Sequence, residues 1–250
     1  MAGHSHWAGI KHKKALIDNK RGKLWSKLSK QIIVAAKMGG GDPDTNIRLR
    51  TAIADAKAVS MPKDNIERAV KKGSGELGAD NYEEILYEGY GPFGVAVLCD
   101  IMTDNRNRTA PEMRKLFEIH GGKLGATNCV AWMFERKGVF VFPADQVEEE
   151  TLMEVALEAG ADDIQQQEDR WEVLCDPDAY SEVSEALEAA GLTAESRQIS
   201  RIPSNTVDLQ TVAEARKILK LMEALDDHDD VQSVSANFNL SSEIASQLEE

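Results

Sequence analysis

The chain has 250 residues, of which 42% are hydrophobic and 29% are charged, and its formal net charge is −14. This length allows two or three domains with buried cores. No apolar run approaches the ~20 residues that span a bilayer, and the start of the chain lacks the apolar segment of a signal peptide, so we expect a cytoplasmic protein without a membrane partner.

The first 37 residues contradict the charge of the whole chain. They contain nine Lys or Arg residues and one acid, Asp18. Residues 1–80 together hold 16 basic and 8 acidic residues, a net charge of about +8, whereas residues 81–250 carry about −22. A basic segment on an acidic body is typical of a protein that places one end against phosphate groups.

The lysines of this segment have helical spacing. On a helical wheel Lys23, Lys27, Lys30 and Lys37 fall on one side and apolar residues on the other. The lysine side is either an anion-binding surface or an ordinary solvated face. The preceding residues favour the first alternative, because their rings can stack on bases while interleaved lysines contact phosphates. The residues predicted here to bind nucleic acid are His6, Trp7, Lys11, His12, Lys13, Lys14, Lys20, Arg21, Lys23, Lys27 and Lys30.

Two further helices follow. Apolar spacing predicts a helix over 45–59 and another from Pro62 to Lys72, with Gly73 as its stop. The polar, glycine-containing stretch after residue 73 predicts a linker. We therefore expect a basic, all-helical domain over residues 1–78.

Strands and helices alternate in the rest of the chain. Residues 95–102 predict a buried strand, 110–120 a helix with a capping box at Thr109 to Glu112, and 122–135 further strand. Residues 138–199 predict the strand, helix, strand, strand, helix, strand order of a ferredoxin-like unit. A helix over 207–226 and a strand over 231–240 then complete a second unit of this type around the first.

The predicted fold class is therefore α+β, with an N-terminal all-helical domain and two ferredoxin-like α/β domains, one inserted in the other. The expected limits are 79–135 plus 204–241 for the discontinuous α+β domain. The inserted acidic ferredoxin-like domain is expected over 136–203.

The segment from Thr103 to Arg108 has two interpretations. Arg106 and Arg108 can contact phosphates or bases beside a helix N-terminus. Alternatively, the segment is a self-bonded turn in which Asp104 neutralises one arginine. The sequence leaves both open, and we count Arg106 and Arg108 among the candidate nucleic-acid-binding residues.

The sequence gives little support for a metal site or a catalytic site. Cys99, Cys129 and Cys175 lie far apart in apolar contexts, which is typical of buried reduced thiols. The acidic run at 226–230 reads as a solvated turn rather than a divalent-ion site. No nucleophile with its base stands out. We therefore expect no metal site, cofactor, small-molecule substrate or enzymatic activity.

Several segments together resemble one family. They are GHSHW followed by IKHKK near the start, MPKDNIERAVKKG at 61–73, YEGYGPFGVAV at 87–97, TDNRNRTA at 103–110 and GGKLGATNCVAWMFERKG at 121–138. Through most of its length the chain resembles the YebC/PmpR family of probable transcriptional regulators, which also includes organellar translational activators. The resemblance implies a helical domain followed by two α/β domains, and action on DNA, on mRNA or on the ribosome. Phe93 departs from it, because a glycine is usual at that position.

Together these observations predict a nucleic-acid-binding regulator of gene expression. The first expectation is a DNA-binding transcriptional regulator that uses its basic N-terminal domain. The alternative is a translation factor or translational activator, with ribosomal or messenger RNA and the ribosome as partners. Reversing Lys23, Lys27 and Lys30 to Glu is expected to abolish binding without unfolding the body.

Overall fold

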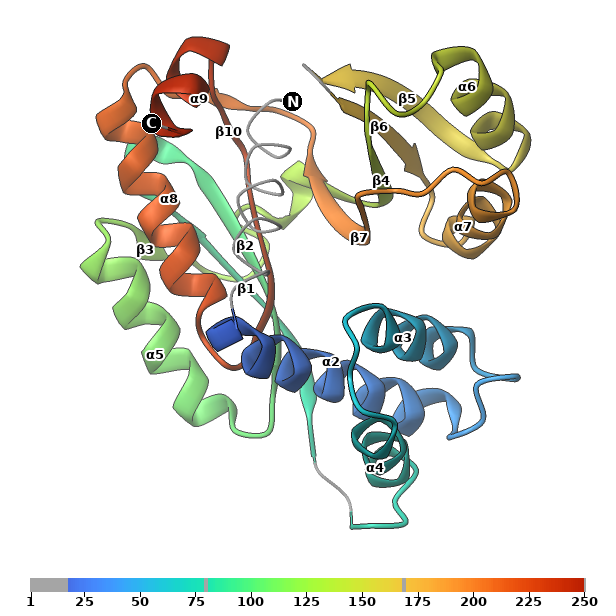
Figure 1. Cartoon of the computed structure of the whole chain (residues 1–250). Coiled ribbons are helices and arrows are strands. Elements are labelled where there is room, and N and C mark those ends of the chain that lie inside the picture. The colour runs from blue at the N-terminus through green and yellow to red at the C-terminus, as the bar shows by residue number, and fades with distance from the viewer. Residues whose placement is uncertain (1–17, 79–80, 168–169, 250) are drawn as a thin grey trace.

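A computed structural model gives the architecture and describes residues 18–78, 81–167 and 170–249. It confirms the predicted fold class: a helical domain is followed by two α+β domains, each with a four-stranded antiparallel sheet. Figure 1 shows the middle domain on the left, the inserted domain at the upper right and the helical domain below it. No helix in the described part of the chain is long and apolar enough to cross a membrane.

The helical domain is organised around its first described helix. α2 (Asp18–Gly39) packs against both α3 (Ile47–Ala58) and α4 (Lys63–Gly73). Residues 32–36 of α2 are all buried, because their sequence is apolar on every side of the helix. Gly73 allows the closest approach, since a Cβ there would lie 2.4 Å from the carbonyl oxygen of Ile33.

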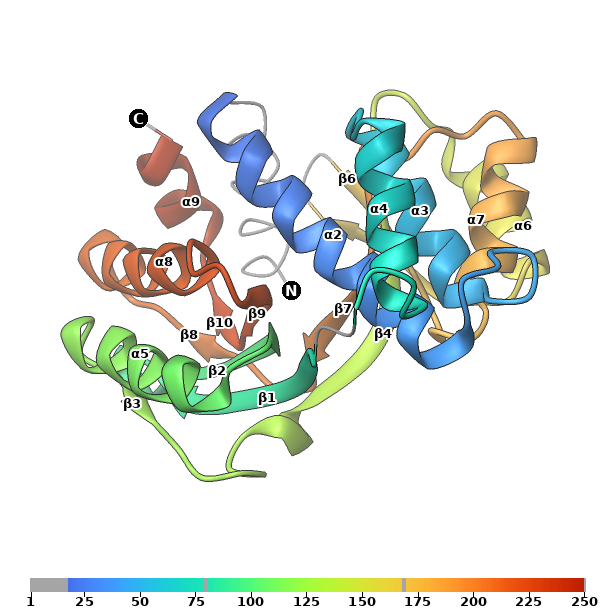
Figure 2. The same ribbon diagram turned by 90° about the horizontal axis from the view of Figure 1, so that it is seen from below.

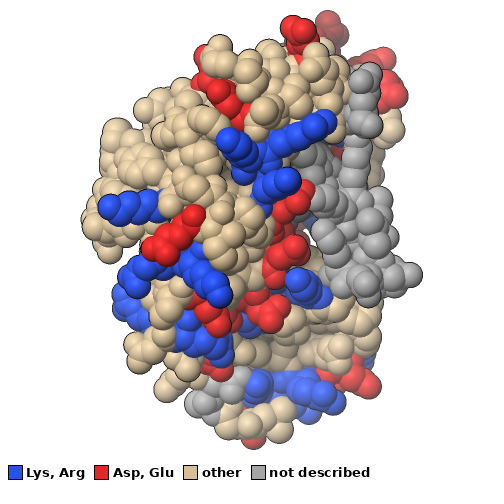
Figure 3. Space-filling view, turned by 90° about the vertical axis from the view of Figure 1, so that its left-hand side faces the viewer, with Lys and Arg blue, Asp and Glu red and all other residues tan. Residues whose placement is uncertain are grey.

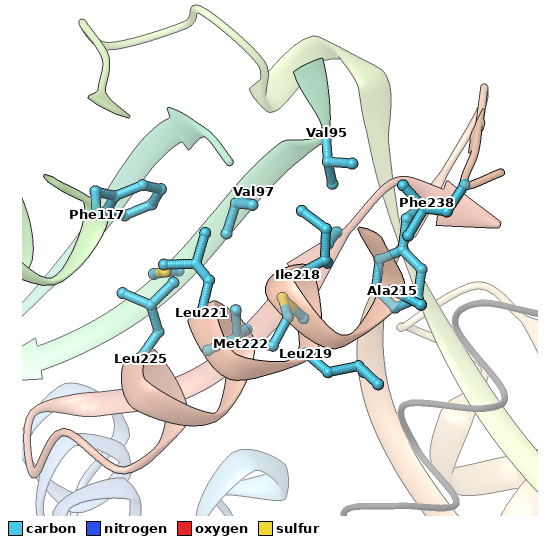
Figure 4. Close-up of a cluster of buried hydrophobic side chains, with 14 of the residues drawn as sticks. Val95, Val97, Phe117, Ala215, Ile218, Leu219, Leu221, Met222, Leu225 and Phe238 are labelled. Carbon is cyan, nitrogen blue, oxygen red and sulfur yellow. The ribbon is translucent and has the colours of Figure 1, made fainter. Parts of the chain in front are cut away.

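The middle domain has its helices on one face of its sheet. Its elements are β1 (Glu83–Tyr90), β2 (Ala96–Thr103), α5 (Arg106–Ile119), β3 (Lys123–Leu124), α8 (Val212–Asp226) and β9 (Val231–Ala236). The strand order is β3-β1-β2-β9, with every neighbouring pair antiparallel. Figure 4 shows how α8 turns Ile218, Leu221 and Leu225 toward Val97 of β2 and Phe117 of α5. Burying each such side chain contributes about 1.5–3 kcal/mol.

One strand of this sheet comes from an unexpected segment. The sequence predicted that residues 122–135 supply two strands, but they supply only β3 and the short helix η2 (Ala131–Met133) before β4 begins at Phe134. The missing strand is β1, which lies between β3 and β2. The prediction failed because β1 carries polar residues at its start and half-exposed ones along its length, so its periodicity is weak.

The inserted domain has the predicted element order. It consists of β4 (Phe134–Pro143), α6 (Glu149–Glu158), β5 (Ala161–Gln167), β6 (Arg170–Cys175), α7 (Tyr180–Ala189) and β7 (Ser196–Pro203). The sheet order β5-β6-β4-β7 places the first strand in the interior, as in ferredoxin-like folds. The pairing of β4 with β7 begins at Phe134 and Pro203. The exact domain limits stay a prediction.

Short elements complete the chain. The β1–β2 turn contains the 3₁₀ helix η1 (Pro92–Gly94), and β8 (Val207–Asp208) pairs in parallel with β10 (Phe238–Asn239). The last helix, α9 (Ser242–Glu249), packs on α8. Figure 2 shows α2 crossing over the middle domain, with α5 and α8 to one side and the inserted domain to the other.

Candidate nucleic-acid interface

Three lysines of α2 form a stripe that faces the middle domain. Lys23, Lys27 and Lys30, here called the lysine stripe, follow one another at helical spacing on a single face. The opposite faces of α2 are occupied by α3 and α4. The lysine stripe therefore meets the turn between α8 and β9, which carries the acidic run Asp226 to Asp230, here called the acid loop.

The first two lysines bind the end of α8. Lys23 Nζ donates to the carbonyl oxygen of Asp227 at 3.1 Å, and Lys27 Nζ donates to that of Asp226 at 2.7 Å. Lys27 also pairs with the Asp226 carboxylate at 3.1 Å. The last carbonyls of a helix have no partner within the helix and carry the negative end of its dipole, so lysines are favourable there.

The third lysine belongs to a buried polar cluster centred on Asp230. Lys30 Nζ lies 2.8 Å from Asp230 Oδ1 and donates to the carbonyl oxygen of Asp229 at 2.8 Å. Arg108 Nη2 lies 2.8 Å from Asp230 Oδ2, and the Thr109 hydroxyl donates to the same oxygen at 2.8 Å. The Asp230 side chain is only 4% exposed. One carboxylate thus joins α2, α5 and the acid loop.

The electrostatics of Asp230 follow from these contacts. Burial acts to raise the pKa of this carboxyl, but hydrogen bonds from Lys30, Arg108 and Thr109 outweigh burial and hold the pKa below its ordinary value of 3.8. Asp230 is therefore ionised at neutral pH. Breaking a buried pair of this kind by removing one partner typically costs about 3–5 kcal/mol.

The structure places the predicted site residues unequally. Lys27 and Lys30 are half-buried or buried against the acid loop, and Lys23 is about half exposed with a longer contact of 3.6 Å to the Asp227 carboxylate. Their predicted contact with nucleic acid stays a prediction, but all three are now engaged by protein. Lys20 and Arg21 lie in α2 with side chains that are not described. His6, Trp7, Lys11, His12, Lys13 and Lys14 lie outside the described residues.

The loop from Thr103 to Arg108 shows the features of the self-bonded turn. The Asn105 side chain accepts from the backbone N–H of Arg108 at 3.1 Å and caps α5, which begins at Arg106. Arg108 pairs with Asp104 at 3.1 Å as well as with Asp230. Thr109, predicted as the helix cap, instead lies inside α5. Arg106 is exposed and has no ion-pair partner among the described residues, so it is the arginine of this loop that remains open to a ligand.

Sequence reasoning treated the lysine stripe and the acid loop separately and missed that they bind each other. About 200 residues separate them in the chain. The sequence did contain a signal for this contact. A row of cations at helical spacing and a compact acidic run have complementary charges, so the two segments can bind each other. The acid loop was read as a solvated turn, and this is wrong for Asp230, which is buried.

None of the three cysteines forms a disulfide. Cys99, Cys129 and Cys175 are free thiols; Cys99 and Cys175 are buried, as predicted, whereas the prediction is wrong for Cys129, which is only partly buried. Burial raises the pKa of Cys175 to about 11, which keeps the thiol protonated. In the part of the chain that the structure describes, no group of three or more His, Cys, Asp or Glu side chains is placed to hold a metal ion.

Comparison with known proteins gives a consistent result. A family model described as the TACO1/YebC protein N-terminal domain matches residues 5–76, and one described as the TACO1/YebC second and third domain matches residues 82–238. A probable transcriptional regulatory protein of Rhodopirellula baltica is 58% identical over 248 residues, which cover 99% of this chain and 100% of the relative. Another, from Natranaerobius thermophilus, is 56% identical over 243 residues, 96% of this chain and 97% of the relative.

A solved structure agrees with the sequence relatives. The crystal structure of a conserved hypothetical protein from Aquifex aeolicus matches with a TM-score of 0.86 and 51% identity, covering 95% of this chain and 98% of that chain. The resemblance seen in the sequence is thus confirmed over nearly the whole length, and the chain belongs to the TACO1/YebC family.

Proposed function

We propose that this protein is a nucleic-acid-binding regulator of gene expression that acts in the cytoplasm and contacts DNA through its basic N-terminal helical domain. The observation that carries the proposal is the separation of charge, about +8 over residues 1–80 against about −22 over the remainder. Such a distribution orients a protein so that one end meets phosphates and the other is repelled. The names of the relatives, probable transcriptional regulatory proteins, support the same level of function.

The contacts of the lysine stripe bear on which basic residues are proposed to meet nucleic acid first. Because the lysine stripe already binds the acid loop, phosphates must compete with Asp226 to Asp230 for it. The first contacts are therefore assigned to His6, Trp7, Lys11, His12, Lys13, Lys14, Lys20 and Arg21.

A second candidate is a translation factor that binds RNA or the ribosome. The supporting observation is that His4, His6, Trp7 and His12 supply rings near the start of the chain, and such rings can stack on unpaired RNA bases. Binding by phosphate contact suits structured RNA as well as duplex DNA. For either target we infer a binding function without catalysis, cofactor or small-molecule substrate.

The test is a pair of binding measurements on the full chain. Lys11, Lys13 and Lys14 are reversed to Glu, and the affinity for duplex DNA and for a folded RNA is measured by fluorescence anisotropy. A control reverses Lys57, Lys63 and Lys71, which are exposed lysines of α3 and α4, and so makes the same change in net charge. Loss of binding in the first variant alone supports the proposal. Equal loss of affinity in both variants would show that the effect comes from net charge alone. Unchanged affinity in both would refute a role for this domain in binding.

Crosslinking in living cells separates the two targets. The protein is recovered with the DNA and RNA attached to it, and both are sequenced. Discrete DNA sites with little RNA support the transcriptional role, whereas ribosomal RNA clustered at one place supports the translation factor.

A further inference from the structure

Three exposed aromatic rings lie at one end of the middle-domain sheet. Tyr90 at the end of β1 is 39% exposed, Phe93 in η1 is 46% exposed, and Trp132 in η2 is 68% exposed. The Tyr90 hydroxyl donates to the carbonyl oxygen of Cys129 at 3.3 Å, which joins the β1–β2 turn to the segment that carries Trp132. These three residues, here called the aromatic rim, belong to neighbouring turns of one domain.

Two of the rings have a lysine beside them. Tyr90 is the cross-strand partner of Lys123, so the two side chains lie next to each other on one face of the sheet. Lys217 of α8 places its Nζ 5.7 Å from the centre of the Phe93 ring. Both lysines are exposed. Each pair therefore combines a flat ring with a cation.

The backbone around the rim is held in place by buried groups. Glu88 is 2% exposed, and its carboxylate accepts from the backbone N–H groups of Asn128 at 2.6 Å, Val130 at 2.9 Å and Ala131 at 2.7 Å. This fixes the turn that presents Trp132. Phe93 has a φ of 64°, in the left-handed region that favours glycine. An exposed ring is thus kept where its backbone is strained, a pattern that clusters at binding sites.

The cations of this domain lie on three elements around its sheet. All Lys and Arg residues of 81–135 and 204–249 lie on α5, β3 and α8: Arg106, Arg108, Arg114, Lys115, Lys123, Arg216, Lys217 and Lys220. Figure 3 shows Lys and Arg gathered on the face formed by α5 and α8, with acids between them. Of these cations, Lys123 and Lys217 lie beside the rim, whereas Arg106 and Arg108 lie at the opposite end of the sheet, just after β2 ends at Thr103.

We infer that the aromatic rim, with Lys123 and Lys217, forms a second nucleic-acid site that takes unpaired bases of RNA. Bases stack on exposed rings whatever their identity, and lysines beside the rings contact the phosphates between successive bases. Duplex DNA hides the faces of its bases, whereas folded RNA offers them in loops and bulges. A protein partner would instead be matched by apolar neighbours around the rings rather than by cations. The inference rests on the proposed function and specifies the ligand of an additional surface.

The test uses substitutions that remove rings while preserving the fold. Phe93→Gly relieves the positive φ, so its thermal midpoint is expected to stay within about 4 °C of the parent. Trp132→Leu keeps an apolar side chain but removes the stacking surface. Leu157→Ala, in α6 of the inserted domain, is the control for loss of an exposed apolar side chain. Each full-length variant is titrated with a single-stranded RNA of about 16 nucleotides and with duplex DNA.

The expected result is a roughly 5- to 100-fold loss of RNA affinity for Phe93→Gly and for Trp132→Leu, with duplex binding and the Leu157→Ala variant unchanged. Parent-like RNA binding by both ring variants would overturn the inference. Full RNA binding by Trp132→Leu alone would indicate an apolar docking surface and would also overturn it. If the parent binds duplex DNA but no single-stranded RNA, this inference fails while the proposed function stands. If it binds neither, the proposed function fails as well.

Discussion

Asp230 is the residue whose carboxylate joins three separate segments at the contact between the helical and middle domains. Its carboxylate receives Lys30 from α2 and Arg108 and Thr109 from α5, and its own backbone belongs to the acid loop. Asp229, its neighbour, is exposed and offers only its carbonyl oxygen to Lys30. Two adjacent aspartates of similar sequence context are therefore expected to contribute differently to the stability of the fold.

Asp230→Asn is expected to lower the free energy of unfolding by about 3–5 kcal/mol, because Lys30 then stays buried without its counter-charge. Asp229→Asn, the matched control, should change it by no more than about 0.5 kcal/mol. Urea unfolding followed by circular dichroism measures both. Equal effects of the two substitutions would show that the buried ion pair contributes nothing specific.

The same residue predicts an acid dependence. Because the pKa of Asp230 in the folded protein lies below its ordinary value of 3.8, its stabilising contribution is complete well above pH 3.8 and is lost as the pH falls below that value. The difference in unfolding free energy between the parent and Asp230→Asn should therefore shrink between neutral pH and about pH 3. Measuring both proteins at a series of pH values checks this, and a difference that grows in acid would contradict the assignment.

At the scale of elements, α2 makes contacts on more of its faces than its amphipathic pattern indicates. The pattern predicted one apolar side and one lysine side open to an anion. In the structure most of the lysine side is also engaged by protein, because the end of α8 and the acid loop provide carbonyl and carboxylate oxygens at matching spacing for Lys23, Lys27 and Lys30. A face that looks solvated in sequence can be a polar interface when an oppositely charged element lies far along the chain.

This changes the expected outcome of reversing Lys23, Lys27 and Lys30 to Glu. The new carboxylates would face the acid loop and the negative end of α8, so the helical domain should separate from the middle domain while each core stays folded. Small-angle scattering should show a larger radius of gyration, and the 74–82 connection should become more sensitive to protease.

Reversal of Lys57, Lys63 and Lys71 makes the same charge change away from the acid loop and should leave both readouts unchanged. An unaltered radius in the lysine-stripe variant would show that other contacts hold the domains together. Loss of nucleic-acid binding in that variant could no longer be assigned to lost phosphate contacts alone.

At the scale of the whole molecule, the separation of charge governs binding. Residues 1–80 have a net positive charge, whereas the inserted domain has a net negative charge. Binding dominated by phosphate contacts releases counterions. Plotted against the logarithm of the salt concentration, the logarithm of the binding constant should therefore fall linearly.

Replacing Lys11, Lys13 and Lys14 with Gln should reduce the slope of that plot by about 0.9 for each lysine that contacts a phosphate of duplex DNA. Anisotropy titrations between about 50 and 200 mM salt measure the slope. Gln at Lys57, Lys63 and Lys71 serves as the control with the same loss of charge. A slope that is unchanged by the first set would exclude these lysines from the interface.

Much of this protein could be derived from its sequence. The helical first domain and the order of elements in the inserted domain follow from local periodicity, stop signals and turns, which act over a few residues. The identity of the family follows from five short segments in the same order. The strand at 83–90 was missed because a short, partly exposed strand has little periodicity of its own.

By itself, therefore, the sequence determined the fold class, the succession of elements and the unequal distribution of charge, since all three depend on local pattern or on composition. Only the tertiary structure decided which charged side chains are free to bind a ligand and which are paired within the protein. The lysine stripe meets the acid loop across about 200 residues of chain, and Tyr90, Phe93 and Trp132 come together through the pairing of β1 and a hydrogen bond to a distant turn. Contacts between remote segments depend on how the domains pack, and no local pattern in either segment encodes that packing.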